Sequence, residues 1–397
     1  MTPHASTPMT LSALLDSSPA DHTAIILPDQ DLRISYGQLR QQVQDLAEAL
    51  ASIGIGHGDR VGMALPNGLP TIVSFLAASV AGTAAPLNPG YKEDEFRFYL
   101  EDTNAKVLLL PPDGLDEARR AAGAVPIVTV RMDESGTVSL EGVTGRKPVS
   151  TPAVDDVALI LHTSGSTGRP KRVPLSHANL SISAQNVARS YALTSDDVSL
   201  CVMPLFHVHG LVASTLATLA SGGTVVVPGK FSPLSFWRVA RDAGATWYSA
   251  VPTIHQLLLA RVQKGEARPA GAEKLRFIRS CSASLPPQVM HDTGVRVRGA
   301  GAGGLRHDRG RAPDVVQSAA ARRAEARLGG PRVPTSASPS ATIRAARWRR
   351  ESAARSAFTA RTSSRVTRTT PTPTPRPSST AAGSAPATRA PSTTRAT

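Results

Sequence analysis

The chain of 397 residues has little of several features that define specialised protein classes. It contains two cysteines, Cys201 and Cys281, which are too few for a disulfide scaffold or a structural zinc site. The N-terminal segment has no basic stretch followed by a long apolar run, so we expect no signal peptide. The longest apolar run, within residues 71–87, is interrupted by Ser, Thr and Gly. These features predict a cytoplasmic protein that does not span a membrane.

Lysine and aromatic side chains are nearly missing from the last quarter of the chain. Residues 294–397 contain 20 Arg, no Lys and two aromatic residues, Trp348 and Phe358. Residues 1–293 carry 24 Lys and Arg against 26 Asp and Glu, so the net charge of +14 belongs entirely to the last quarter. We therefore predict a nearly neutral folded domain over 1–293 and a low-complexity, disordered tail over 294–397.

Strand-like and helix-like segments alternate along residues 1–293. Residues 34–56 carry apolar side chains at helical spacing, with a Gly at the end; these are Leu39, Val43, Leu46, Leu50 and Ile53. Short apolar strands are predicted within residues 59–65, 105–111, 157–163, 222–229, 246–252 and 274–284. The polar, Gly- and Pro-containing residues 132–156 are predicted to form a surface linker. Alternation of this kind predicts an α/β fold with mostly parallel sheets.

A loop rich in small and hydroxyl residues follows the strand predicted at 157–163. Its glycines let the backbone approach an anion closely, its hydroxyl and N–H groups can donate to phosphate oxygens, and its lysine adds a positive charge. The Walker pattern is excluded because its GK[ST] ending is missing. Ser and Gly richness alone also fits a flexible turn, but this ordered string is much more specific. The predicted phosphate-binding residues are Thr163, Ser164, Gly165, Ser166, Thr167, Gly168 and Lys171.

This string resembles the phosphate loop of the adenylate-forming superfamily, which contains acyl-CoA synthetases, luciferases and peptide-synthetase adenylation domains. The resemblance covers about residues 10–293 and implies that ATP binds at this loop, with Lys171 as a catalytic residue. A carboxylate would attack the α-phosphate to give acyl-AMP and pyrophosphate, and the acyl group would then pass to coenzyme A. Arg172 departs from the family, which usually has Gly after the lysine. It could alter the exit of the loop or add a phosphate contact.

Two histidines stand close together in the segment "MPLFHVHGL", residues 203–211. If this segment were a strand, His207 and His209 would face the same way. A metal pair is one interpretation, although no third ligand is evident nearby, and a half-buried structural histidine is another. The resemblance implies that His207 lines the carboxylate pocket and helps to position the acid and the α-phosphate. His207 is therefore a predicted catalytic and substrate-binding residue, and His209 a predicted substrate-binding residue.

A strand-to-helix junction is predicted within residues 245–259. It resembles the wall of the family's acyl pocket, so Val251 and Thr253 are predicted to contact the substrate. Thr253 is also the predicted N-cap of the following helix. A plain core strand and helix explains most of these residues equally well. His255 could face either the pocket or solvent.

The strand predicted within 274–284 ends in the small-residue loop "SCSAS". The resemblance implies that this loop packs against adenine through Ser282, Ala283 and Ser284. It also borders the acyl site, where Arg279, Ser280 and Ser282 are predicted to bind the substrate. Together with "FHVHG" and "WYSAVPTIHQ", this Ser-rich form most resembles the oxalate–CoA ligase branch, and hydroxyls beside Arg279 suit a small, doubly charged acid. Cys281 as a nucleophile is a competing interpretation, but no His or Asn partner is readable for it.

Three elements that the resemblance implies do not occur in the written sequence. They are an aromatic-Gly-Met-Thr-Glu loop whose Glu holds Mg²⁺, an Arg-Thr-Gly-Asp segment whose Asp binds the ATP ribose, and a C-terminal lid domain with a catalytic lysine. A one-base shift of codons permitted for residues 304–318 gives Ala-Tyr-Gly-Met-Thr-Glu-Ala-Ala-His-Gln-Met-Ser-Ser-Asn. A two-base shift for residues 377–388 permits Phe-Val-Asp-Gly-x-Trp-Phe-Arg-Thr-Gly-Asp. We therefore hypothesise two reading-frame slips, which leave no metal ligand in the written frame.

The sequence thus predicts an ATP-dependent acid–CoA ligase that uses ATP, Mg²⁺ and coenzyme A. Its substrate would be a small carboxylic acid such as oxalate, or a fatty acid, and the chain as written would be impaired. One alternative is a nucleic-acid-binding protein that acts through its basic tail, although the tail has few aromatic residues for stacking. Another is an inactive nucleotide-binding remnant, which differs only in whether ATP still binds.

Overall fold

The structure is a computed structural model that describes residues 6–163, 170–262, 268–298 and 306–307. These residues lie within one compact unit. The predicted tail, apart from its first residues and the pair 306–307, lies outside the described residues, so its disorder and the missing lid domain stay predictions.

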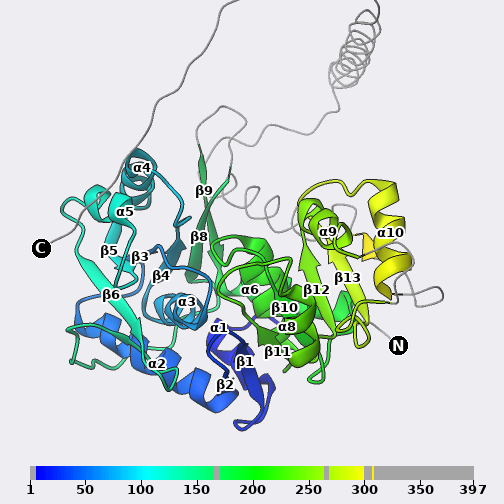
Figure 1. Cartoon of the computed structure of the whole chain (residues 1–397). Coiled ribbons are helices and arrows are strands. Elements are labelled where there is room, and N and C mark those ends of the chain that lie inside the picture. The colour runs from blue at the N-terminus through cyan, green and yellow to red at the C-terminus, as the bar shows by residue number, and fades with distance from the viewer. Residues whose placement is uncertain (1–5, 164–169, 263–267, 299–305, 308–397) are drawn as a thin grey trace, which may run out of the picture. The chain divides into compact units, whose positions relative to one another are not determined.

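Two seven-stranded sheets organise the described residues (Figure 1). The first has the order β14 (Arg306–His307), β13 (Phe277–Ser280), β12 (Trp247–Ala250), β10 (Val198–Cys201), β11 (Thr224–Val226), β1 (Thr23–Leu27), β2 (Leu32–Ser35). The second has the order β7 (Val138–Leu140), β6 (Ile127–Met132), β5 (Ala105–Leu110), β3 (Arg60–Met63), β4 (Thr83–Pro86), β8 (Val157–Thr163), β9 (Lys171–Ser176). Only the pairs β1–β2, β6–β7 and β8–β9 are antiparallel among the described strands. The predicted α/β class with mostly parallel sheets is confirmed.

Helices connect these strands and cover the sheets. They are α1 (Leu11–Leu14), η1 (Leu15–Ser17), α2 (Tyr36–Ser52), α3 (Leu69–Ala81), α4 (Glu93–Thr103), α5 (Asp116–Ala121), α6 (His177–Ser190), the π-helix η2 (His209–Leu216), α7 (Ala217–Ala220), α8 (Phe236–Asp242), α9 (Pro252–Leu259) and α10 (Pro287–Arg298). Helix α3 is apolar on all sides and almost wholly buried, as expected for a helix enclosed by other elements. It belongs to the largest core cluster, which contains Ile25 and Val225 of the first sheet and Val61 and Leu159 of the second.

Helix α2 shows why the local sequence folds as predicted. The Ser35 hydroxyl accepts from the Gln38 N–H, and the Gln38 side chain accepts from the Ser35 N–H, which forms a capping box. The predicted apolar stripe is buried through Leu50. The prediction is wrong at Ile53, which lies just after the last helical residue and is 39% exposed.

The linker predicted over 132–156 is wrong in one part. Val138–Leu140 form the edge strand β7, which pairs antiparallel with β6. Gly136, with φ 83°, makes the turn that brings the two strands together. Because only three residues pair, the strand has too little alternation to stand out from a polar segment.

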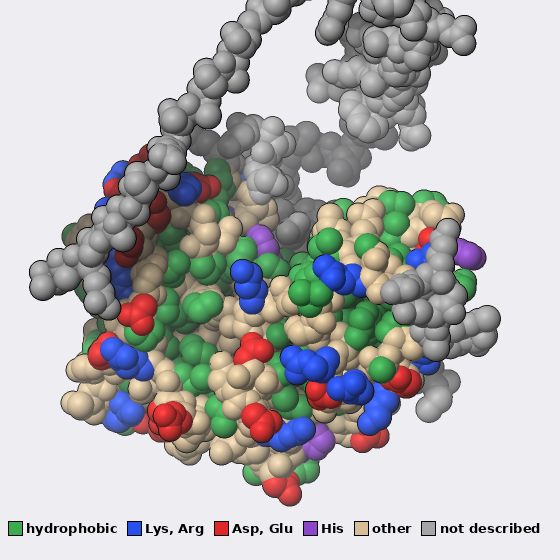
Figure 2. All heavy atoms as spheres, viewed as in Figure 1, with side chains coloured by type: hydrophobic (Ala, Val, Ile, Leu, Met, Phe, Trp, Pro, Cys, Tyr) green, Lys and Arg blue, Asp and Glu red, His purple; other side chains and the backbone are tan. Residues whose placement is uncertain are grey.

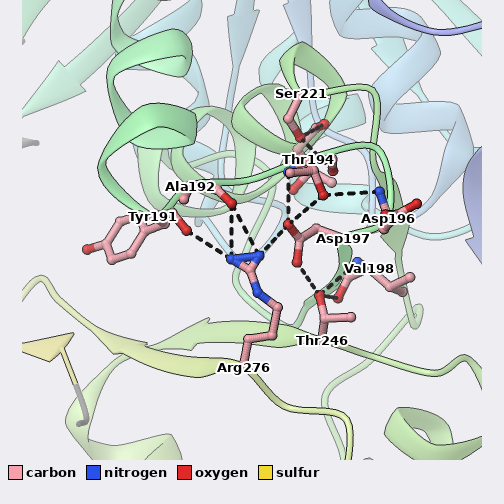
Figure 3. A network of polar contacts seen from close by, with 10 residues as sticks. Tyr191, Ala192, Thr194, Asp196, Asp197, Val198, Ser221, Thr246 and Arg276 are labelled. Carbon is pink, nitrogen blue, oxygen red and sulfur yellow. Dashed lines mark hydrogen bonds and ion pairs between the residues drawn. The ribbon is translucent and has the colours of Figure 1, made fainter. Parts of the chain in front are cut away.

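A polar network ties together the amino ends of β10, β12 and β13 (Figure 3). The carboxylate of Asp197, whose side chain is 2% exposed, accepts from the Thr194 N–H at 2.9 Å, the Thr246 hydroxyl at 2.7 Å and Arg276 Nη1 at 2.7 Å. Arg276 also donates to the carbonyl oxygens of Tyr191 and Ala192, which follow α6. The network fixes one end of these strands, and their opposite ends carry the polar cluster described below.

The surface of the described residues matches their balanced charge. Figure 2 shows acidic and basic side chains interspersed on the visible face, without a continuous basic area among them. No helix in the described ranges is both long and apolar enough to cross a membrane.

Candidate functional site

The first sheet brings three predicted site segments together at the carboxyl ends of its parallel strands. Strands β10, β12 and β13 run parallel, and Ser249 is the partner of both Cys201 and Arg279 in the register (Figure 1). The segments that leave their carboxyl ends carry His209, Val251 and Ser282, respectively. Loops at the carboxyl ends of parallel strands are the usual place for a ligand in open α/β sheets.

His209 lies at the centre of a buried polar cluster. Its Nε2 is 2.6 Å from Ser249 Oγ, and its Nδ1 is 3.2 Å from Ser282 Oγ. Burial, with a further contribution from the positive charge of Arg279, lowers the pKa of His209 to about 3. The ring is therefore neutral at neutral pH and offers one donor and one acceptor.

Arg279 is fully buried beside this ring. Its Nη1 donates to Ser249 Oγ at 3.0 Å, and its Nε donates to Tyr191 Oη at 3.1 Å. The Tyr191 ring stacks on Phe277 with 4.9 Å between ring centroids, so the acceptor of Nε is itself held in place. Because Ser249 accepts from Arg279, the Ser249 hydroxyl proton is free to point at His209 Nε2. The cluster is thus a connected chain of hydrogen bonds rather than separate contacts.

The histidine segment differs from the strand considered in the sequence analysis. The chain turns after β10, and the π-helix η2 begins at His209. π-helical turns are frequent at functional sites. His207 is exposed, with its ring 4.4 Å from that of Phe206, whereas His209 is buried. Although His207 has exposed surface, neighbouring atoms desolvate part of its ring, which lowers its pKa. Gly210 is required here because a Cβ would overlap the carbonyl oxygens of Met203 and Pro204.

A metal site at His207 and His209 would need a third ligand. Among the described residues, no group of three His, Cys, Asp or Glu side chains is placed to hold an ion.

The junction after β12 corrects one prediction and decides an open one. Helix α9 begins at Pro252, so Val251 is the N-cap and Thr253 is not; Thr253 is exposed within the first turn. Proline fits the first helical position because it needs no N–H partner there. Val251 is half-buried against the core cluster around Tyr248. His255 does not face solvent: it is 1% exposed, with Nδ1 3.3 Å from Tyr248 Oη, and burial lowers its pKa to about 4.

The loop after β13 is where the predicted adenine-binding residues lie. Ser280, the last residue of the strand, is fully buried. Ser282, Ala283 and Ser284 are exposed, and Ser282 has a left-handed backbone with φ 71°. A left-handed non-glycine residue is uncommon and is often found in functional loops.

The predicted phosphate loop connects the antiparallel strands β8 and β9. Thr163 ends β8, half-buried, and pairs directly with the exposed Lys171 at the start of β9. The predicted residues Ser164, Gly165, Ser166, Thr167 and Gly168 lie outside the described residues.

Arg172, the departure from the family pattern, contacts helix α4 in the described structure. It donates to the backbone carbonyl of Asp102, whose carboxylate is 2.9 Å from His162 Nε2. His162 and Arg172 are partners across the β8–β9 hairpin, and both contact Asp102 of α4.

The structure therefore assembles two groups of predicted residues. One is the Thr163–Lys171 pair, and the other joins His209, Arg279 and Ser282. Sequence reasoning missed Ser249 and Tyr191, which link the second group through hydrogen bonds. Ser249 lies within the strand predicted at residues 246–252, but nothing local indicates its partners.

The fold is that of the large N-terminal domain of an adenylate-forming enzyme. The sequence model of the family described as AMP-binding enzyme matches residues 14–303, and the chain belongs to that family.

Known proteins agree with this assignment. The chain is 41% identical to a probable CoA ligase of Humulus lupulus, over 71% of this chain and 56% of the relative. It is 40% identical to an oxalate–CoA ligase of Arabidopsis thaliana, over 71% of this chain and 57% of the relative. The ATP-bound crystal structure of MatB from Rhodopseudomonas palustris matches with a TM-score of 0.65 and 26% identity, over 75% of this chain and 59% of that one. The chain thus spans a little over half the length of the curated relatives it matches.

Proposed function

We propose that the chain carries the adenylation body of an AMP-forming acid–CoA ligase. The observation that carries the proposal is the pairing of Thr163 with Lys171, which places a lysine and a hydroxyl at the two ends of the "TSGSTGRPK" loop in a chain of the AMP-binding family. The positive charge of Lys171 is suited to stabilise the charge that develops on phosphate oxygens when a carboxylate attacks the α-phosphate.

We also propose a small, doubly charged acid as the substrate, with oxalate the first candidate. The cluster of His209, Ser249 and Arg279 presents donors from side chains that are more than nine-tenths buried. An aliphatic chain can form no hydrogen bond or ion pair with such groups, whereas a second carboxylate can accept from them. An oxalate–CoA ligase among the relatives favours the same choice.

ATP, Mg²⁺ and coenzyme A are the cofactors and co-substrates of the proposed reaction. Mg²⁺ would neutralise phosphate charge, but the described residues contain no three-ligand group for it. We therefore assign no Mg²⁺-dependent step to this chain's residues. His209 would hold the acid as a neutral donor or acceptor, and the exposed Ser282–Ser284 loop would receive a flat ring.

We also propose that the coding DNA after codon 303 encodes the magnesium-binding loop in a shifted reading frame. Strand β14 pairs parallel with β13, with Arg279 opposite Arg306 and Ser280 opposite His307. In the displaced reading, Tyr-Gly-Met stands at residues 305–307 and Thr-Glu follows. Positions 306 and 307 thus pair with the strand end that carries the polar cluster, where we propose that the motif of the displaced reading would lie.

The experiment is an assay of acid-dependent AMP release. A chain whose frames are restored from its coding DNA should release AMP with ATP, Mg²⁺, coenzyme A and oxalate, and much less with a long fatty acid. The chain as written should release little or none. The proposal fails if the restored chain releases no AMP with any small carboxylic acid, or if the written chain works at the same rate.

A further inference from the structure

Ser249 of β12 lies between Arg279 and His209 in the polar cluster. Its side chain is fully buried, and among the described residues its hydroxyl has two hydrogen-bonding partners, Arg279 Nη1 at 3.0 Å and His209 Nε2 at 2.6 Å. A guanidinium can only donate, so the Ser249 oxygen accepts from Arg279. The hydroxyl proton then has one acceptor within reach, which is His209 Nε2.

The opposite arrangement would leave the hydroxyl proton of Ser249 without an acceptor. If Nε2 of His209 carried the ring proton, the Ser249 oxygen would accept from both neighbours, and its own proton would point at neither. A buried donor without an acceptor lowers stability, because it has lost its hydrogen bonds to water. The contacts of Ser249 therefore favour an unprotonated Nε2, and the neutral ring of His209 then carries its proton on Nδ1.

The sulfur beside the ring does not decide between the two nitrogens. Cys281 Sγ is 3.2 Å from both Nδ1 and Nε2 of His209. An atom at this distance from both nitrogens lies over the ring, because in the ring plane it would overlap a ring carbon. The N–H bond and the lone pair of an imidazole lie in the ring plane, so the thiol fixes neither nitrogen.

The Nδ1 nitrogen of His209 lies beside the loop that follows β13. It is 3.2 Å from Ser282 Oγ, which can accept its proton. Ser282 is exposed, with a left-handed backbone, whereas Ser249 is fully buried, so Nδ1 is the ring nitrogen on the side of the exposed loop. A carboxylate oxygen in place of the Ser282 hydroxyl would accept the same proton, whereas an unprotonated Nδ1 would repel it.

We propose that Ser249 is a positioning residue that holds His209 in its Nδ1–H tautomer, so that His209 donates a hydrogen bond to a carboxylate oxygen of the bound acid. Ser249 acts through the histidine and does not itself touch the acid. Arg279 contributes to the same orientation, because its donation to Ser249 directs the hydroxyl proton toward Nε2. The role toward the acid rests on the proposed function, whereas the tautomer does not.

The test is NMR spectroscopy of the full chain with ¹⁵N-labelled histidine rings, because protonated and unprotonated ring nitrogens have different chemical shifts. The signals of His209 are those that disappear in His209→Gln, and at neutral pH we expect a protonated Nδ1 and an unprotonated Nε2.

Ser249→Ala should lower the ratio of the Nδ1–H to the Nε2–H tautomer about fivefold or more, the factor that corresponds to the loss of one hydrogen bond between neutral groups. The matched control is Ser199→Ala in the neighbouring strand β10. Ser199 is also fully buried, and its hydroxyl has no hydrogen-bonding partner among the described residues, so this variant should keep the ratio of the unchanged chain.

Two results would overturn the role of Ser249. One is a His209 ring that is protonated on Nε2 in the unchanged chain. The other is a Ser249→Ala chain that folds, by circular dichroism, and keeps the tautomer ratio of Ser199→Ala. If Ser249→Ala does not fold, the tautomer in the unchanged chain decides the question.

Titration with oxalate separates the tautomer from the proposed function. Oxalate should shift the signals of the His209 Nδ1–H group in the unchanged chain, and Ser249→Ala should need about fivefold more oxalate for the same shift. Oxalate without effect on these signals would overturn the role toward the acid and the proposed acid site together, while a protonated Nδ1 would still confirm the tautomer.

Discussion

Replacing Asp197 tests whether the network in Figure 3 holds the sheet that carries the site. The carboxylate accepts three hydrogen bonds, from the Thr194 N–H, the Thr246 hydroxyl and Arg276. Hydrogen bonds to a charged group each contribute about 1.5–3 kcal/mol to the free energy of unfolding. The Arg276 bond counts for less, because that side chain is 40% exposed and screened by solvent.

We expect Asp197→Ala to lower the free energy of unfolding by about 3 kcal/mol, because it removes the acceptor of all three hydrogen bonds and leaves the partly buried Thr246 hydroxyl one partner fewer. Asp197→Asn should cost about 1–2 kcal/mol, because its amide oxygen can still accept from Thr194 and Arg276 while the charge is lost.

The control is Asp196→Ala, which makes the same charge change at the neighbouring residue. Asp196 is exposed, and its part in the network is its backbone N–H, which donates to Thr194 Oγ1. We expect this variant to lie within about 0.5 kcal/mol of the unchanged chain in urea unfolding. An Asp197→Ala chain as stable as Asp196→Ala would refute the reasoning.

Three further outcomes are expected. His209 and His255, with pKa values of about 3 and 4, stay neutral in the fold while the unfolded chain binds protons below about pH 6.5, so stability should fall as the pH drops from 6.5 toward 4. At pH 5 the free energy of unfolding should be about 2 kcal/mol lower for each histidine. Urea unfolding at pH 7 and pH 5 measures this difference, and it should be about 2 kcal/mol smaller in His209→Gln. In the frame-restored chain, Lys171→Met should lower AMP release at least about a hundredfold, and Arg172→Met, whose contact is with α4, should change it far less. Arg279→Gln should raise the KM for oxalate about tenfold or more without a matching rise for ATP; equal effects on both would contradict its assignment to the acid.

Local patterns of the sequence predicted the local structure well. The predicted stripe from Leu39 to Leu50 depends on residues within one helix, so it is readable in order along the chain. The capping box at Ser35 and Gln38 is equally local, although it was not predicted. The error at Thr253 is also local, because the helix begins at Pro252, two residues earlier than an N-cap at Thr253 would allow.

The polar cluster could be predicted only in part, because its contacts join distant segments. Arg279 and Ser282 were identified from one segment, the strand predicted within 274–284 and its loop, and His209 from the segment "MPLFHVHGL". Their connection through Ser249 and Tyr191 depends on the order of β10, β12 and β13 in the sheet, which no short segment encodes. For the same reason the contact between Cys281 and His209, 72 residues apart in the sequence, could not be predicted from the residues around either.

The most direct test of the central claim, that this chain is a ligase body followed by out-of-frame coding, is the nucleotide sequence from codon 285 onward. The account predicts the Tyr-Gly-Met-Thr-Glu motif one base out of step at residues 305–309 and the Arg-Thr-Gly-Asp motif two bases out of step within residues 377–388. Coding DNA that holds neither motif in any frame would contradict it.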